Sequence, residues 1–392
     1  MKNKSKREFL KSIGSAGVFL AGANLPVWAI NTSAIAATSG SSYKLLKPDH
    51  NGLKLMKGFT SRVVATTMKK TLSYRWHPNP DGGATFPTED GGWIYVSNSE
   101  SEMGGVGALR FNSKAEIVKF YSICRGTSIN CAGGRTPWNT WLTCEEFGNG
   151  YTWECDPYGK KPAELISSLG SFTHEAAAVD PITSTIYQTE DTERSGFYRF
   201  VPEKKINAKS ELAMATGKFQ VMKIESGNKV KWNNVNDPLA KKGSLNLMKR
   251  KPNKKIKYKA FNRGEGAWYH DGKVHFATTG NHQIWTYDIA NETCKVLYKG
   301  NGQLKDPDNV VVSNTGLVMA AEDRGNMEIC GISNKTNKAF PIVRIAGHHK
   351  NSEVTGPAFN PSGTRLYFSS QRGKDGKNGI TFEVTGPFDM LK

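Results

Sequence analysis

Short runs of mostly apolar, β-branched and aromatic residues recur along the chain and end in acidic or amide side chains. Such runs are typical of buried or half-buried strands; they cover residues 93–100, 141–146, 186–191, 317–323 and 366–371. A sixth run, residues 274–279, has the same pattern but ends in threonines. Successive runs begin 48, 45, 88, 43 and 49 residues apart. Apart from one double gap, this period predicts an all-β propeller.

Each run is preceded by a second apolar run, and the two are joined by turn residues such as Asp180-Pro181. The pattern therefore predicts a hairpin in every repeat. In a hairpin the start of the first strand and the end of the second lie at the same edge. We therefore expect Glu175, which opens a first strand, to lie beside Glu190 and Asp191, which end the next one.

In a propeller the first strand of each blade lines the central channel, so these acidic edges should converge at one mouth. The expected ring contains Glu100, Glu145, Glu146, Glu175, Glu190, Asp191, Glu265, Asp308, Glu322 and Glu353. So many carboxylates cannot all stay ionised in one funnel without cations between them. Carboxylates alone favour calcium. A single acid at a strand end would be a local turn cap, but recurrence in several repeats predicts a metal cluster.

The six cysteines stand at positions 124, 131, 144, 155, 294 and 330. In an exported protein an even number is ordinarily interpreted as disulfides, and the absence of a C-x-x-C pair argues against zinc. Cys144 differs because two glutamates follow it directly. A thiolate among oxygen ligands indicates a transition metal beside the calcium. Both interpretations stay open for Cys144, with Cys131 or Cys155 as its partner in the disulfide alternative.

Several motifs resemble those of PhoX-type bacterial alkaline phosphatases. They are residues 130–146, 174–180, 189–191, 265–268 and 307–309, and the match runs in order over most of residues 58–388. The resemblance implies a six-bladed propeller with its active site at the channel mouth. It also implies calcium (Ca²⁺) together with a pair of ferric ions (Fe³⁺) bridged by an oxo group.

The resemblance further implies roles for particular residues. Cys144 is expected to bind the iron pair, Glu265 to be an iron or calcium ligand, and Arg263 to hold the substrate phosphate. The enzyme would hydrolyse phosphate monoesters, with a metal-bound oxygen rather than a side chain as the nucleophile. No G-x-S-x-G sequence, which would indicate a serine nucleophile, is present. Arg372 follows a strand end and is a weaker candidate for a second phosphate contact.

The first residues predict an export signal rather than part of the fold. The segment Ser5-Lys-Arg-Glu-Phe-Leu-Lys11 resembles a twin-arginine motif with Lys6 in place of the first arginine, and Ala34-Ile-Ala36 fits a cleavage site. We therefore expect residues 1–36 to be cleaved after export by the twin-arginine machinery. Residues 37–392 would form one periplasmic or secreted catalytic propeller, without stable membrane insertion and as a monomer.

The chain of 392 residues carries a formal net charge of +18. No helix-turn-helix, zinc-finger or RNA-binding signature accompanies this charge, so we do not expect nucleic acid as a partner. Much of the excess lies in residues 241–259, within a predicted basic insertion at about residues 203–260. A positive surface would attract phosphate esters.

Two other functions fit the same repeat. One is a calcium-dependent propeller hydrolase of lactones or other esters, and the other is a non-catalytic binding propeller whose ions brace the channel. Neither of these functions needs a thiolate, so a metal-bound Cys144 would distinguish the phosphatase from both of them.

Overall fold

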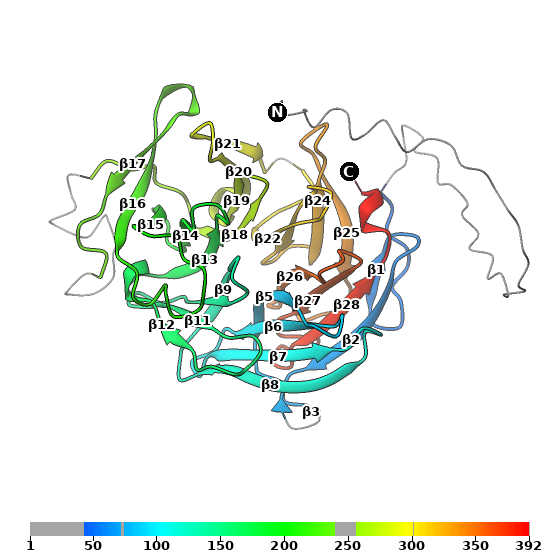
Figure 1. The fold of residues 1–392 in the computed structure, drawn as a ribbon. Coiled ribbons are helices and arrows are strands. Elements are labelled where there is room, and N and C mark those ends of the chain that lie inside the picture. Colours follow the sequence, from blue (N-terminus) through cyan, green and yellow to red (C-terminus); the bar gives the residue numbers. More distant parts are fainter. Residues whose placement is uncertain (1–42, 72–73, 240–255, 301, 392) are drawn as a thin grey trace, which may run out of the picture. The chain divides into compact units, whose positions relative to one another are not determined.

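The computed structural model describes residues 43–71, 74–239, 256–300 and 302–391. The predicted export signal, residues 1–36, lies outside the described residues, as does most of the basic stretch 241–259. The described part of the chain contains six antiparallel sheets of four or five strands, arranged around a common centre (Figure 1). The predicted six-bladed propeller is therefore confirmed.

Each blade begins with its innermost strand. Blade 1 contains β5 (Pro80–Pro87), β6 (Trp93–Ser99), β7 (Gly105–Phe111) and β8 (Ile117–Arg125). Blade 2 contains β9 (Asn130–Arg135), β10 (Trp141–Glu145), β11 (Thr152–Cys155) and β12 (Glu164–Leu165). Blade 3 contains β13 (His174–Val179), β14 (Ile186–Glu190), β15 (Phe197–Pro202), β16 (Gly217–Ile224) and β17 (Val230–Asn234).

The remaining blades follow the same order. Blade 4 contains β18 (Gly264–His270), β19 (Lys273–Thr278), β20 (Gln283–Asp288) and β21 (Thr293–Tyr298). Blade 5 contains β22 (Pro307–Val312), β23 (Val318–Glu322), β24 (Glu328–Ile332), β25 (Ala339–Ile345) and β1 (Leu53–Leu55). Blade 6 contains β26 (Val354–Phe359), β27 (Arg365–Ser370), β28 (Ile380–Thr385) and β2 (Thr60–Thr66). Smaller elements are the hairpin β3 (Lys70–Thr71) and β4 (Tyr74–Arg75), and the 3₁₀ turns η2 (Ser167–Leu169), η3 (Ser226–Asn228), η4 (Thr279–Asn281) and η5 (Phe388–Met390).

Strands from both ends of the described chain close the ring. β2 pairs antiparallel with β28, from Thr60 opposite Thr385 to Thr66 opposite Ile380. β1 likewise becomes the outermost strand of blade 5 by pairing with β25. Blades 6 and 1 also pack against each other, since the Trp93 indole donates a hydrogen bond of 3.0 Å to the Tyr367 hydroxyl.

Residues 203–260, predicted as an insertion, are partly blade structure. β16 and β17 lie in this range and form the outer strands of blade 3. The double gap between the third and fourth repeats therefore contains these two strands as well as residues outside the described part.

A β-bulge interrupts the innermost strand of every blade near the same end. Between two paired positions, each inner strand has two residues opposite one on the second strand: 81–82, 131–132, 175–176, 265–266, 308–309 and 356–357. A bulge bends the strand and redirects a side chain that would otherwise follow the regular alternation. The six bulges bring one end of all inner strands to the channel axis.

Small residues allow the inner strands to approach one another at these bulges. A Cβ atom added to Gly82 would lie 2.5 Å from Ala132 Cα, and one added to Gly266 would lie 2.6 Å from Asn309 Cα. The cavity enclosed by this level of the channel is about 20 Å³, roughly the space of one water. The channel is therefore closed beneath the mouth.

Candidate metal centre and phosphate site

The mouth of the channel is built from two tiers of side chains. The upper tier follows the end of the second strand in each blade: Glu100, Glu146, Asp191, Thr279, Asp323 and Gln371. Its backbone is fixed in the same way in all six blades, because each N–H donates to the carbonyl of the residue just before the inner strand or at its entry. Examples are Glu146 N to Ile129 O at 2.8 Å and Asp323 N to Asp306 O at 3.0 Å.

The deep tier comes from the bulges of the inner strands. It contains Asp81, Cys131, Glu175, Glu265 and Asp308, all of them buried. Asp81 and Cys131 were not among the residues predicted for the site. They stand at the same position of the repeat as Glu175 and Glu265, so a strict alignment of the six repeats was the signal that could have found them.

The structure divides the predicted pairs of neighbouring acids. Glu146 and Asp191 face the mouth, whereas Glu145 and Glu190 point into their blades. Glu145 accepts hydrogen bonds from the backbone N–H of Ser128 and Tyr151 at 3.0 and 3.1 Å. Successive residues of a strand point to opposite faces, which explains this division.

Two more in-blade acids have comparable donors. Glu190 accepts from the Gly196 N–H at 2.9 Å and the Tyr198 hydroxyl at 2.7 Å. Glu322 accepts from the backbone N–H of Lys305 at 2.9 Å and of Glu328 at 3.0 Å. Glu145, Glu190 and Glu322, predicted as metal ligands, thus brace the loops around the mouth instead of lining it.

Cys144 also lies away from the mouth, which corrects its predicted position. It is fully buried in the apolar cluster that contains Leu142, Ile166 and Phe172, and its sulfur lies 3.7 Å from Thr152 Oγ1. Burial raises the pKa of this thiol to about 12. All six cysteines lie in the described residues and are free, so Cys144 does not form a disulfide with Cys131 or Cys155 in this structure either.

Two compact groups of potential ligand atoms lie at the mouth. In one, atoms of Glu100, Cys131 and Glu146 all lie within 4.8 Å of one another. In the other, atoms of Glu175, Glu265 and Asp308 do. The groups adjoin, because the Cys131 thiol lies 3.4 Å from Glu175 Oε1. The first group combines sulfur with oxygen, and the second contains oxygen alone.

The electrostatics of both tiers show strong like-charge repulsion. Burial and the neighbouring Glu265 and Glu146 carboxylates hold the pKa of Glu175 well above its usual range. Burial and the carboxylates of Glu265 and Glu353 do the same for the pKa of Asp308. Glu353, at the entry of the last inner strand, has its pKa raised to about 8 by burial and by Asp323.

Some buried atoms of the mouth have no hydrogen-bond donor among the described residues. They include Glu175 Oε2 and the side-chain oxygen of Gln371, whose Nε2 donates to both Asp81 and Glu100 at 2.6 Å. A buried carboxylate oxygen without a donor is costly unless a cation satisfies it. The carboxylate oxygens at the mouth therefore fit hard cations as ligands, and the thiol of Cys131 fits a softer metal.

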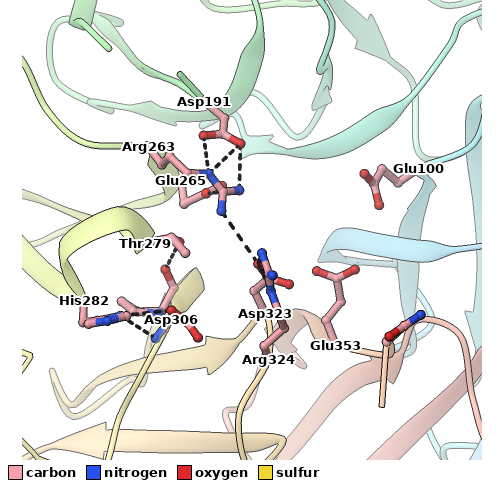
Figure 2. Close-up of polar contacts among 12 residues, drawn as sticks. Glu100, Asp191, Arg263, Glu265, Thr279, His282, Asp306, Asp323, Arg324 and Glu353 are labelled. Carbon is pink, nitrogen blue, oxygen red and sulfur yellow. Dashed lines mark hydrogen bonds and ion pairs between the residues drawn. The ribbon is translucent and has the colours of Figure 1, made fainter. Parts of the chain in front are cut away.

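Two arginines stand among these acids. Figure 2 shows Arg263 between Asp191 and Glu265: its Nη2 lies 2.9 Å from Asp191 Oδ2 and 3.0 Å from Glu265 Oε1. Its Nη1 is less engaged, with Asp323 Oδ2 at 3.9 Å. Arg263 adopts φ of +56°, a left-handed conformation that a non-glycine residue adopts at some energetic cost and that is common at functional sites. On the other side, Arg372 Nη1 pairs with Glu353 and its Nη2 lies 3.9 Å from Glu100.

The structure therefore brings together eight of the twelve residues predicted for the acidic ring, the iron contact and the phosphate contact: Glu100, Glu146, Glu175, Asp191, Arg263, Glu265, Asp308 and Glu353. Arg372, the weaker candidate, also lies there, and Cys131, Asp81 and Asp323 join them. An acidic funnel with two partly exposed guanidinium groups can hold cations and then receive an anion.

Comparisons with known proteins agree with this geometry. A family model described as alkaline phosphatase PhoX matches residues 94–161 and 148–296, which together span 203 of the 392 residues. The solved structure of PhoX from Pseudomonas fluorescens, in complex with the transition state analogue vanadate, aligns with a TM-score of 0.73. The two sequences are 16% identical, and the alignment covers 89% of this chain and 99% of the other.

A structural genomics protein of unknown function from Bacteroides thetaiotaomicron aligns with a TM-score of 0.51 at 8% identity, over 83% of this chain and 76% of that one. At such identities the structural likeness shows the fold alone. A search of curated protein sequences found no match. Among the described residues, no helix is long and apolar enough to cross a membrane.

Proposed function

The chain belongs to the PhoX family of alkaline phosphatases, and on that premise we propose that it hydrolyses phosphate monoesters at the mouth of its propeller channel with the help of bound cations. The observation that carries this proposal is the pairing of two acidic ligand groups with two partly exposed arginines at one place. Neither the lactone hydrolase nor the binding propeller accounts for the thiol and the guanidinium groups together.

We assign calcium to the oxygen-only group, Glu175, Glu265 and Asp308. We assign ferric iron to the group that contains sulfur, with Cys131 in the role that the sequence predicted for Cys144. When bound, such cations neutralise phosphate oxygens and stabilise charge on the attacking and leaving oxygens. All three residues of the oxygen-only group are buried, and in the other group Cys131 is buried between two half-buried glutamates. The carboxylates of the oxygen-only group are surrounded mainly by other acids, which fits the binding of cations.

Arg263 orients the substrate phosphate. Asp191 and Glu265 hold its Nε and Nη2 atoms, which fixes the plane of the guanidinium group, whereas Nη1 has only the more distant Asp323 Oδ2, 3.9 Å away, as an ion-pair partner. A fixed fork loses little conformational entropy when it donates to a phosphate oxygen. Arg372 is positioned in the same way by Glu353 and is the second candidate contact.

We also propose that the protein acts outside the cytoplasm. The twin-arginine-like segment and the Ala-Ile-Ala site in residues 1–36 support export and cleavage. Twin-arginine substrates are generally exported already folded, which suits a protein whose cation ligands come from several blades.

The test is a metal analysis combined with an assay on one preparation. The purified protein should contain calcium and iron, be coloured by the ferric–thiolate contact, and cleave 4-nitrophenyl phosphate. Protein that is free of both metals after careful isolation yet still cleaves this ester would refute the cation assignment. Metal-loaded protein without any phosphatase activity would refute the proposed reaction.

A further inference from the structure

A hollow of about 540 Å³ opens on the surface between blades 3 and 4, outside the acidic mouth. Its walls come from the loops that follow β14 and precede β18, and from the η4 turn and β20. They consist of Glu193, Arg194, Lys259, Ala260, Phe261, Asn262, Asn281 and Trp285. None of these residues belongs to either ligand group.

The backbone around the hollow is hydrogen-bonded to the backbone of Arg263, the proposed phosphate contact. Asn262 precedes Arg263 in the chain, and the backbone N–H of Arg263 donates to Thr192 O at 2.9 Å. The carbonyl of Arg263 accepts from Thr279 N at 3.0 Å. The segments that lead to Glu193 and Asn281 are thus fixed to the backbone of Arg263. A phosphate held by Arg263 would have its organic part next to this hollow.

The lining of the hollow consists mainly of positively charged side chains and neutral hydrogen-bond donors. The Lys259 ammonium lies 5.9 Å from the centre of the Phe261 ring and 5.6 Å from that of Trp285. Two aromatic faces stabilise a cation without neutralising it, and within the described part of the chain Lys259 has no ion pair. Arg194 adds a second cation and the amides of Asn262 and Asn281 add N–H donors, against the single acid Glu193.

We propose that this hollow receives the organic part of the phosphate ester and favours esters that carry a second anionic group, a carboxylate or a further phosphate. Lys259 is the specificity-determining residue, because it presents its charge at the hollow on a rigid aromatic support. This inference rests on the proposed phosphatase function and adds the substrate class to it.

The test compares two esters that differ in one charge, phenyl phosphate and 4-carboxyphenyl phosphate. The wild-type enzyme should prefer the carboxylated ester by about 3- to 10-fold in kcat/KM, as expected for one partly solvated charge contact. In Lys259→Met the preference should fall to near unity, mainly through KM. Lys218→Met, which removes an exposed lysine of β16, is the matched control and should keep the wild-type ratio.

Binding of the matched phosphonates, measured by calorimetry, keeps the inference testable without turnover. Wild type should bind the carboxylated phosphonate more tightly than it binds phenylphosphonate. Lys259→Met should bind the two phosphonates with equal affinity. Equal preference in wild type and Lys259→Met, by kinetics or by binding, would overturn the subsite. Selective phosphonate binding by a protein that hydrolyses neither ester would leave the subsite in place and contradict the proposed reaction instead.

Discussion

Buried carboxylates occur in two regions of this molecule, within the blades and at the channel mouth, and their surroundings differ. Within the blades, Glu145, Glu190, Glu322 and Glu383 each accept at least two hydrogen bonds, although Glu190 receives both on Oε2 and its Oε1 has no partner among the described residues. Glu383, for example, accepts from Arg62 at 2.7 Å, from Arg365 at 2.6 Å and from the Tyr367 hydroxyl at 2.7 Å. At the mouth, Glu175 faces Glu265, Glu146, Asp308 and Asp81, and one of its oxygens has no donor among the described residues.

The difference shows how to recognise a cation site in a protein with many buried acids. Burial alone raises the pKa of a carboxyl group and does not require a metal, because protein donors can satisfy the charge. Mutual burial of acids without donors is different, since only cations can compensate all of them at once. The following experiments separate the two regions.

Removal of cations should have the largest effect. Exhaustive chelation should abolish phosphatase activity and lower the melting temperature, because a ligand present at a hundredfold excess over its Kd stabilises a protein by about 2.7 kcal/mol per site. Adding calcium and iron back should restore both. Activity and melting temperature that remain unchanged after verified removal would contradict the distinction between the regions.

Replacing Cys131 and Cys144 by serine, one at a time, should distinguish a metal ligand at the mouth from a buried residue of the blade core. Cys131→Ser should lose iron, colour and most activity while it retains calcium, because serine is a poor substitute for sulfur at a transition metal. Cys144→Ser should keep iron and lose only stability, on the order of 1–3 kcal/mol, because it places a hydroxyl in an apolar cluster. An iron assay and a melting curve on both variants decide the matter, and loss of iron from Cys144→Ser alone would reverse the assignment.

Arg263→Ala should raise KM for phosphate esters, with some loss of kcat if the contact tightens in the transition state. Loss of a charge-assisted hydrogen bond corresponds to about 10- to 150-fold in kcat/KM. The matched control is Arg324→Ala, which removes a nearby arginine that is 65% exposed against 33% for Arg263. Equal effects of the two changes would mean that only general positive charge matters at the rim.

Glu190→Gln should have the smallest effect on activity and should act mainly on the pH dependence of stability. Burial raises the pKa of Glu190 to about 7, above the ordinary pKa of a glutamate in the unfolded chain. At pH values between these two, the folded state is protonated at Glu190 and the unfolded chain is not. This group therefore stabilises the fold at low pH, and the contribution is lost as pH rises toward and through 7. The expected difference is about 3 kcal/mol. Denaturant titrations from pH 4.5 to 8 should show a flatter profile for Glu190→Gln than for wild type.

Metal content supplies the control for this last experiment. Glu190→Gln should retain its calcium and iron, whereas Glu175→Gln, which removes one acid from the mouth, should bind calcium more weakly. Loss of metal from Glu190→Gln would show that the in-blade acids take part in cation binding after all.

Much of this architecture could be predicted from the sequence. The period of the strand runs indicated the blades, and hairpin geometry correctly placed the start of β13 opposite the end of β14, where His174 pairs with Glu190. The different directions of Glu145 and Glu146 were not predicted from the sequence, although the alternation of side chains along a strand implies them. Alternation also puts Cys144 on the same face as Leu142, which points to the apolar core rather than the mouth.

The position of Cys131 and Asp81 was harder to foresee. Both lie in β-bulges, where the backbone register departs from simple alternation, and a bulge depends on hydrogen bonds between strands that composition does not reveal. Arg263 is similar, because its left-handed backbone conformation turns its side chain over the mouth, and only a resemblance suggested its role.

The distribution of the ligand groups over several blades has a consequence for the order of folding. One group joins Glu100 of blade 1 to Cys131 and Glu146 of blade 2, and the other takes Glu175, Glu265 and Asp308 from blades 3, 4 and 5, so no single blade contains either complete ligand group. Contacts of such long sequence separation form late, after the chain has overcome the entropy of closing a large loop. Cation uptake by a refolding chain should therefore report the moment when the blades that share a ligand group have come together, and the metal serves as a natural probe of packing between blades.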